Sequence, residues 1–143
     1  MRKSKVLWLI AFGIVVTNLI FTITPLGGEN LQTIVCDLLP IICGILAISA
    51  LLYAYKSFHE VDLTKTAWLF ILIGMVLNTV AESTYAFLEL GMNLNMDENY
   101  PSLADFFWCA AYIPLFAGLA TMFIGYKNSG FPMGNPKMYV VIG

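Results

Sequence analysis

Three acidic residues, Asp37, Glu82 and Asp105, lie inside long apolar stretches of this 143-residue sequence. A charged side chain at the centre of a membrane helix costs about 2.5–3.5 kcal/mol on insertion scales, and such residues are usually functional. All seven Lys and Arg residues lie outside these stretches. Three carboxylates in a low-dielectric space cannot all stay ionised without a counter-charge, so at least one should hold a proton, bind a cation or face water. The pattern predicts a proton-responsive or cation-binding site, or a pocket for an amine or polyhydroxy ligand.

Polar residues around these acids fall on single helical faces. Three sets have the i, i+4, i+7 spacing of one face. They are Asn78, Glu82 and Tyr85, with Glu89 one turn further; Asp105, Cys109 and Tyr112; and Thr33, Asp37 and Pro40, with Gly44 one turn further. In lipid, such faces should turn toward one another or toward a water-filled cavity. Asn18 comes at a similar depth to Asp37 and Glu82. The candidate ligand- or cation-binding residues are therefore Glu82, Asp37, Asp105, Asn78, Tyr85, Asn18 and Tyr112.

A simpler interpretation of these residues is structural. Asp105 is so near the start of its apolar stretch that it can cap a helix together with Ser102. The other polar residues can form ordinary hydrogen bonds between helices. The lone His59 and three cysteines without CxxC spacing indicate no particular metal site, so the metal and any cofactor stay unknown and no catalytic residue is assigned.

The elements that must position these residues are membrane helices. The sequence is 59% hydrophobic and 11% charged, with a mean hydropathy of +0.81, which is far too apolar for an ordinary soluble domain. Crossing a bilayer takes about 20 apolar residues. Four segments reach that length, at residues 6–24, 31–55, 67–88 and 102–125. The sequence predicts an all-α integral membrane bundle of four transmembrane helices.

The basic residues predict the orientation of this bundle. All seven fall on the side that holds the N-terminus, whereas the opposite loops carry only acidic charges. By the positive-inside rule, the N-terminus is cytoplasmic and the candidate acids lie in the outer leaflet of the cell membrane. The lipid bilayer is the expected partner, and nucleic acid is excluded because no basic stripe exists.

The last residues predict a second region. Residues 1–127 form the four-helix transmembrane domain, and residues 128–143 comprise a cytoplasmic loop and an apolar run from Met138 to Gly143. Six apolar residues cannot cross a bilayer. The run is interpreted as the start of a fifth helix that is truncated here, the alternative being a short interfacial tail.

Small residues in the last predicted span suggest a contact between helices. Ala117, Thr121 and Gly125 are spaced i, i+4, i+8. Small residues let membrane helices approach closely. The stripe is a candidate surface for a neighbouring helix of the same chain or for a homo-oligomer.

A longer pattern resembles a known class of membrane regions. Glu82-Ser83-Thr84-Tyr85 precedes an outer loop, then residues 100–108 (YPSLADFFW) open the next span and Tyr112-Ile113-Pro114 follows. This arrangement resembles the multi-pass N-terminal membrane sensor regions of bacterial and archaeal signalling proteins. Those regions typically precede histidine kinase, PAS or diguanylate cyclase modules, so the resemblance implies a downstream signalling domain or partner.

The function expected from these features is a non-catalytic sensory or ligand-binding input module with an acidic pocket in the outer leaflet. One alternative is a proton- or cation-linked transport or accessory subunit of a membrane complex, although the inner halves of the spans carry few polar groups for such a path. The other is a membrane-embedded enzyme with an acidic metal site. None of the sequence motifs GxSxG, HExxH, the P-loop or the Rossmann fingerprint occurs, so an enzyme is the less favoured alternative.

Overall fold

The computed structural model describes residues 2–24, 27–59, 62–96 and 98–130, with the backbone alone for residues 2–11 and 29. Every regular element in these ranges is helical: α1 (Arg2–Ile23), α2 (Glu29–Ser57), α3 (Leu63–Ala86), the π-helical turn η1 (Phe87–Gly91) and α4 (Leu103–Asn128). This confirms the all-α class. The predicted fifth helix, from Met138 to Gly143, lies outside the described residues.

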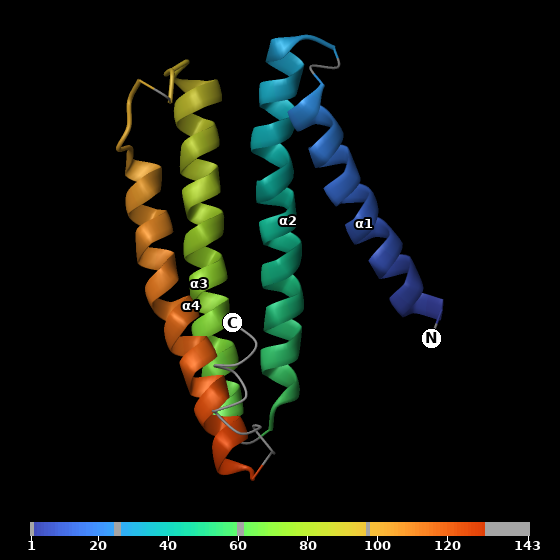
Figure 1. The fold of residues 1–143 in the computed structure, drawn as a ribbon, viewed down its shortest axis with the longest axis vertical. Helices are drawn as coiled ribbons and strands as arrows, with labels where there is room; N and C mark the ends of the chain where they lie inside the picture. Colours follow the sequence, from blue (N-terminus) through green and yellow to red (C-terminus); the bar gives the residue numbers. More distant parts are fainter. Residues whose placement is uncertain (1, 25–26, 60–61, 97, 131–143) are drawn as a thin grey trace, which may run out of the picture.

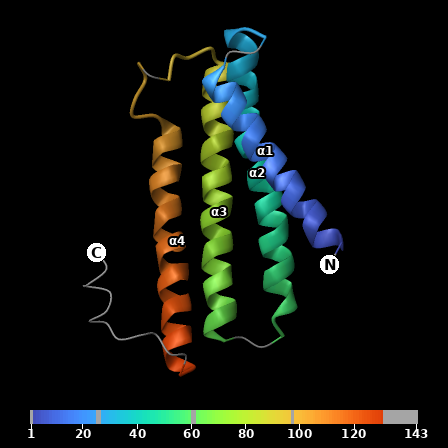
Figure 2. The ribbon, with the colours of Figure 1, turned by 45° about the vertical axis from the view of Figure 1, so that its right-hand side comes forward.

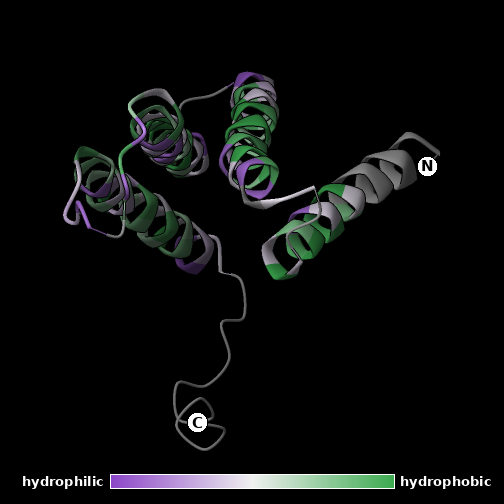
Figure 3. Ribbon diagram, turned by 90° about the horizontal axis from the view of Figure 1, so that it is seen from above, coloured by the Kyte–Doolittle hydropathy of each residue, from purple (hydrophilic) through white to green (hydrophobic). Residues whose placement is uncertain are grey.

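Three helices are long and apolar enough to cross a membrane. They span Asn30–Ser57, Leu63–Gly91, which includes η1, and Leu103–Asn128, whereas the part of α1 with described side chains, Phe12–Ile23, is a shorter apolar helix. Hydrophobic residues predominate along α2, α3 and α4 (Figure 3). Many large apolar side chains on these helices are exposed in the isolated chain, as a lipid-facing surface requires. The chain is therefore a helical membrane protein.

The helices form an open row in which each packs on its neighbour in sequence. The most extensive contact joins α3 and α4, the next joins α2 and α3, and the smallest joins α1 and α2. In two views α2, α3 and α4 run alongside one another, while α1 diverges from α2 toward the N-terminus (Figures 1 and 2). The α3–α4 pair therefore forms the most extensive interface between the described helices.

Small residues at seven-residue spacing explain why α3 and α4 approach so closely. Ala67, Gly74 and Ala81 on α3, and Ala104, Ala111 and Gly118 on α4, are all buried. A methyl group placed on Gly118 would lie 3.0 Å from the Ala67 carbonyl oxygen. A seven-residue repeat keeps one face of each helix toward its partner, and small residues allow the two backbones into direct contact.

Where α2 ends and α3 begins, a helix cap and one lysine hold the connection between the two helices. Asp62 caps α3, since its Oδ1 accepts a 2.7 Å hydrogen bond from the Lys65 backbone N–H. The Lys65 Nζ donates to the Phe58 carbonyl at 3.0 Å and lies 5.3 Å from the centre of the Tyr55 ring. Nearer the middle of the helices, Gly44 of α2 lies directly against Thr79 of α3.

Candidate functional site

The described lysines lie at one end of the helices, with the helix cap Asp62, and the other described acidic side chains lie toward the opposite end. Lys56, Lys65 and Lys127 lie where α2 ends, α3 begins and α4 ends. The opposite end, where α2 begins, α3 and η1 end and α4 begins, is here called the acidic end (upper part of Figure 1). The acidic end holds Asp37, Glu82, Glu89, Glu98 and Asp105, and no Lys or Arg occurs among its described residues.

Two carboxyl groups from different elements meet at the acidic end. Asp37 of α2 lies close to Glu89 of η1, and Glu82 of α3 is near enough to act on Asp37 electrostatically. The Asp37 Oδ2 atom is buried and accepts no hydrogen bond from the described part of the chain. Two ionised carboxylates this close repel one another, and a proton or a cation between them removes that repulsion. Asp37, Glu82 and Glu89 are called the carboxyl cluster below.

Glu82 also connects the carboxyl cluster to α4. The Trp108 Nε1–H donates a 3.2 Å hydrogen bond to Glu82 Oε1. The Trp108 ring lies against Tyr85, with 5.7 Å between ring centres and a 43° tilt. Because Trp108 belongs to α4 and the other two residues to α3, this hydrogen bond and this ring contact are part of the α3–α4 interface.

Asp105 has a different role from the other acids. Its Oδ2 accepts hydrogen bonds from the Ser102 backbone N–H at 2.6 Å and from the Ser102 hydroxyl at 2.8 Å. Together they form a capping box at the start of α4. The capping interpretation of Asp105 is thereby confirmed, and Glu89 rather than Asp105 is the acid beside Asp37.

The remaining sequence candidates are spread over the structure. Tyr85 of α3 packs its ring against the Trp108 ring of α4, and Asn78 is half-buried two turns earlier on α3. Asn18 lies between α1 and α2, where the Thr22 hydroxyl donates to its Oδ1 at 3.4 Å. Tyr112 of α4 is 67% exposed in the isolated chain.

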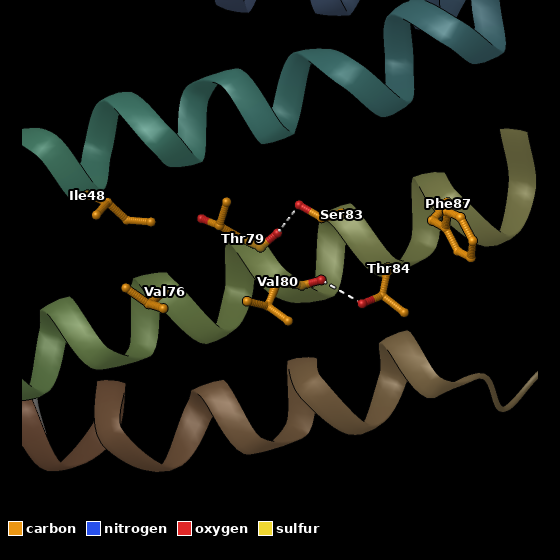
Figure 4. A pocket seen from close by; sticks show the side chains of 7 residues that line it. All are labelled: Ile48, Val76, Thr79, Val80, Ser83, Thr84 and Phe87. Atoms are coloured by element: carbon orange, nitrogen blue, oxygen red, sulfur yellow. Dashed lines mark hydrogen bonds between the residues drawn. The ribbon is translucent and has the colours of Figure 1, made fainter. Parts of the chain in front are cut away.

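Three cavities accompany these residues. One of about 420 Å³ lies beside Asn18, between α1 and α2. A second, of about 360 Å³, is a groove between α2 and α3 lined by Ile48, Val76, Thr79, Val80, Ser83, Thr84 and Phe87 (Figure 4). The Ser83 and Thr84 hydroxyls donate to backbone carbonyls four residues earlier, at 2.8 Å each. This groove therefore presents few free donors and is apolar in character.

The third cavity is polar and is called the loop pocket. It has a volume of about 330 Å³ and is lined by Tyr85, Met96, Tyr100, Ser102 and Asp105. It lies between the end of α3, the loop that follows η1 and the start of α4. In the described ranges, no three His, Cys, Asp or Glu side chains are arranged to hold a metal ion.

Sequence reasoning placed Glu89 on the polar face of the third span but left it out of the candidate ligand residues, and it missed the partnership of Trp108. Glu89 lies seven residues after Glu82, and this spacing puts both on one helical face; that signal was present, but the residue fell just beyond the predicted span. From the sequence, Trp108 was interpreted as an aromatic residue at the membrane–water interface. No local sequence pattern indicates its hydrogen bond to Glu82.

Comparison with protein-family models, with curated proteins and with solved structures finds no match to this chain. The resemblance to membrane sensor regions therefore rests on the sequence motifs alone.

Proposed function

We propose that this chain is a non-catalytic sensory or ligand-binding input module of the cell membrane. The observation that carries the proposal is the carboxyl cluster, in which acids from α2, α3 and η1 converge at the acidic end without a basic neighbour among the described residues. Ionisable groups inside membrane helices without a structural counter-charge are typical of functional sites.

The cluster supplies enough energy to move helices. Two unit charges about 4 Å apart repel by about 4 kcal/mol at an effective dielectric constant of 20. Losing or gaining that repulsion changes a two-state equilibrium by a factor of about 10³. A proton or a cation at Asp37 and Glu89 therefore favours a close approach of α2 and η1, and its departure favours their separation.

The distribution of basic residues predicts which side of the membrane the carboxyl cluster faces. All seven basic residues of the sequence lie on one side of the predicted spans. With α1 as a fourth span, the positive-inside rule places this side in the cytoplasm and the acidic end outside. A downstream signalling domain, or contact between two copies through Ala117 and Thr121, would carry the response onward; Gly125 of the same stripe lies near Leu63 of α3.

The test measures the separation of α2 and η1 in the full chain in lipid nanodiscs. Spin labels are placed at Leu31 and Met92, both exposed at the acidic end, after the native cysteines are replaced. The label distance should change with pH and with added cations. The double variant Asp37→Asn/Glu89→Gln, and to a lesser degree Glu82→Gln, should lose this response.

The matched control is Glu98→Gln, which removes one acidic charge from the exposed loop at the same end. It should respond as the native chain does. A native chain whose label distance is constant across pH and cation concentration would contradict the proposal, as would an unchanged response in the double variant.

A further inference from the structure

The loop pocket has the size and position of a site for a small water-soluble molecule. Its volume of about 330 Å³ is near the lower limit of the roughly 300–1,000 Å³ typical of small-molecule pockets. Met96 forms a buried wall, with 7% of its surface exposed, and Tyr100 is 75% exposed at the mouth. Because Met96, Tyr100 and Ser102 lie in or beside the connecting loop, the pocket is reached without crossing the membrane.

The lining combines aromatic rings with one carboxylate. Tyr85 and Tyr100 contribute two rings, and ring faces attract cations. Asp105 contributes the charge: both hydrogen bonds from Ser102 fall on Oδ2, and Oδ1 accepts none from the described side chains and backbone. Asp105 thus caps the start of α4 through Oδ2, and its Oδ1 can accept a hydrogen bond from a ligand.

The surroundings decide the sign of the ligand charge. The other acids of the acidic end add negative potential, and the described lysines lie at the opposite end. An anion would be repelled, and a neutral polyhydroxy molecule would gain nothing from this field. We propose that the loop pocket binds a small organic ammonium ion, with the ammonium group between Asp105 and the rings of Tyr85 and Tyr100.

Occupation of the loop pocket is connected to the carboxyl cluster by direct contacts. Tyr85 lines the pocket and also contacts the Trp108 ring, and Trp108 donates to Glu82. A ligand that shifts Tyr85 therefore acts on the hydrogen bond at Glu82. This inference rests on the proposed function, because it names the chemical class of the molecule that the input module recognises.

The test uses choline as the probe and isothermal titration calorimetry of the full chain in nanodiscs. The comparison ligand is the uncharged analogue of choline in which a tert-butyl group replaces the trimethylammonium group. Choline should bind and the analogue should not. Asp105→Asn keeps an oxygen that can accept from Ser102 but removes the charge, and should weaken binding about fivefold, as expected for one partly exposed charge pair.

Two further variants test the aromatic contribution. Tyr100→Leu should weaken choline binding about threefold, as expected for one exposed cation–π contact, whereas Tyr100→Phe should retain it. Tyr53→Leu, at an exposed tyrosine near the basic end of α2, serves as the control and should bind as the native chain does.

The outcomes separate this inference from the proposed function. Equal binding of choline and its analogue, no choline binding at millimolar concentration, or native affinity in both Asp105→Asn and Tyr100→Leu would overturn the inference. Binding of a neutral sugar in place of choline would do the same. A pH-dependent label distance without choline binding leaves the proposed function standing. Choline binding to a chain whose label distance stays constant across pH and cation concentration leaves this inference standing and contradicts the sensory response of the proposed function.

Discussion

Replacing Gly118 by alanine should separate α3 from α4. The added methyl group would lie 2.8 Å from the Ile71 Cγ1 atom, 3.0 Å from the Ala67 carbonyl oxygen and 3.1 Å from the Ile71 backbone nitrogen. Two of these three neighbours are backbone atoms of α3, so no side-chain rotation relieves the contact. The whole of α3 or α4 must shift instead.

The expected size of the effect follows from two opposing terms. Overfilling a tightly packed contact costs about 1–3 kcal/mol, whereas Gly→Ala inside a helix gains about 1 kcal/mol. The net loss of unfolding free energy for Gly118→Ala is therefore up to about 2 kcal/mol. Gly125→Ala is the matched control in the same helix, because its methyl group would meet only the Leu63 Cβ, at an ordinary 3.7 Å.

The assay is reversible unfolding in mixed detergent–SDS micelles, followed by tryptophan emission, to which Trp108 at the α3–α4 contact contributes. The helix-propensity gain is common to both variants, so the difference between them isolates the packing cost. Gly118→Ala should be less stable than Gly125→Ala by about 1–3 kcal/mol. Equal stabilities, or a more stable Gly118→Ala, would show that the two backbones are not in the described contact.

Three further substitutions test individual hydrogen bonds. Trp108→Phe keeps an aromatic ring but loses the donor to Glu82, and should lower the unfolding free energy by about 1 kcal/mol in the same assay. Asp105→Ala loses both hydrogen bonds from Ser102 and should cost about 1 kcal/mol, whereas Asp105→Asn should cost less than half of that; similar losses would argue against the capping box. Asp62→Ala removes the cap of α3 and should speed amide hydrogen exchange in its first turn only, with no change expected in α4.

The helices were predictable from the sequence because span length and the apolar stretches depend on local composition. Their ends were less so. The third predicted span, residues 67–88, begins four residues after α3 does at Leu63, because the Asp62 cap rather than hydropathy sets that start. At its other end, η1 continues the apolar helix to Gly91 and carries Glu89 within it.

The partners of individual side chains were harder to predict, because they depend on how helices are rotated against one another. The buried residues of α4 include Ala104, Ala111 and Gly118, while sequence reasoning selected the stripe of Ala117, Thr121 and Gly125. Small residues occur on more than one face of this helix, and only the neighbouring helix distinguishes them. The same limit applied to the acids. Their predicted depth in the membrane did not show that Asp37 lies beside another carboxyl group whereas Asp105 caps a helix.

The contact between Asp37 and Glu89 is measured most directly by cross-linking. In the full chain with its native cysteines replaced, Asp37→Cys/Glu89→Cys should be joined rapidly by a short thiol-specific cross-linker. The control pair is Leu38→Cys/Glu89→Cys, in which Leu38 is the next residue of α2 and is 45% exposed. Fast cross-linking of the first pair alone is the result expected from the carboxyl cluster. Equal or faster cross-linking of the control pair would show that the acids of α2 and η1 do not face one another.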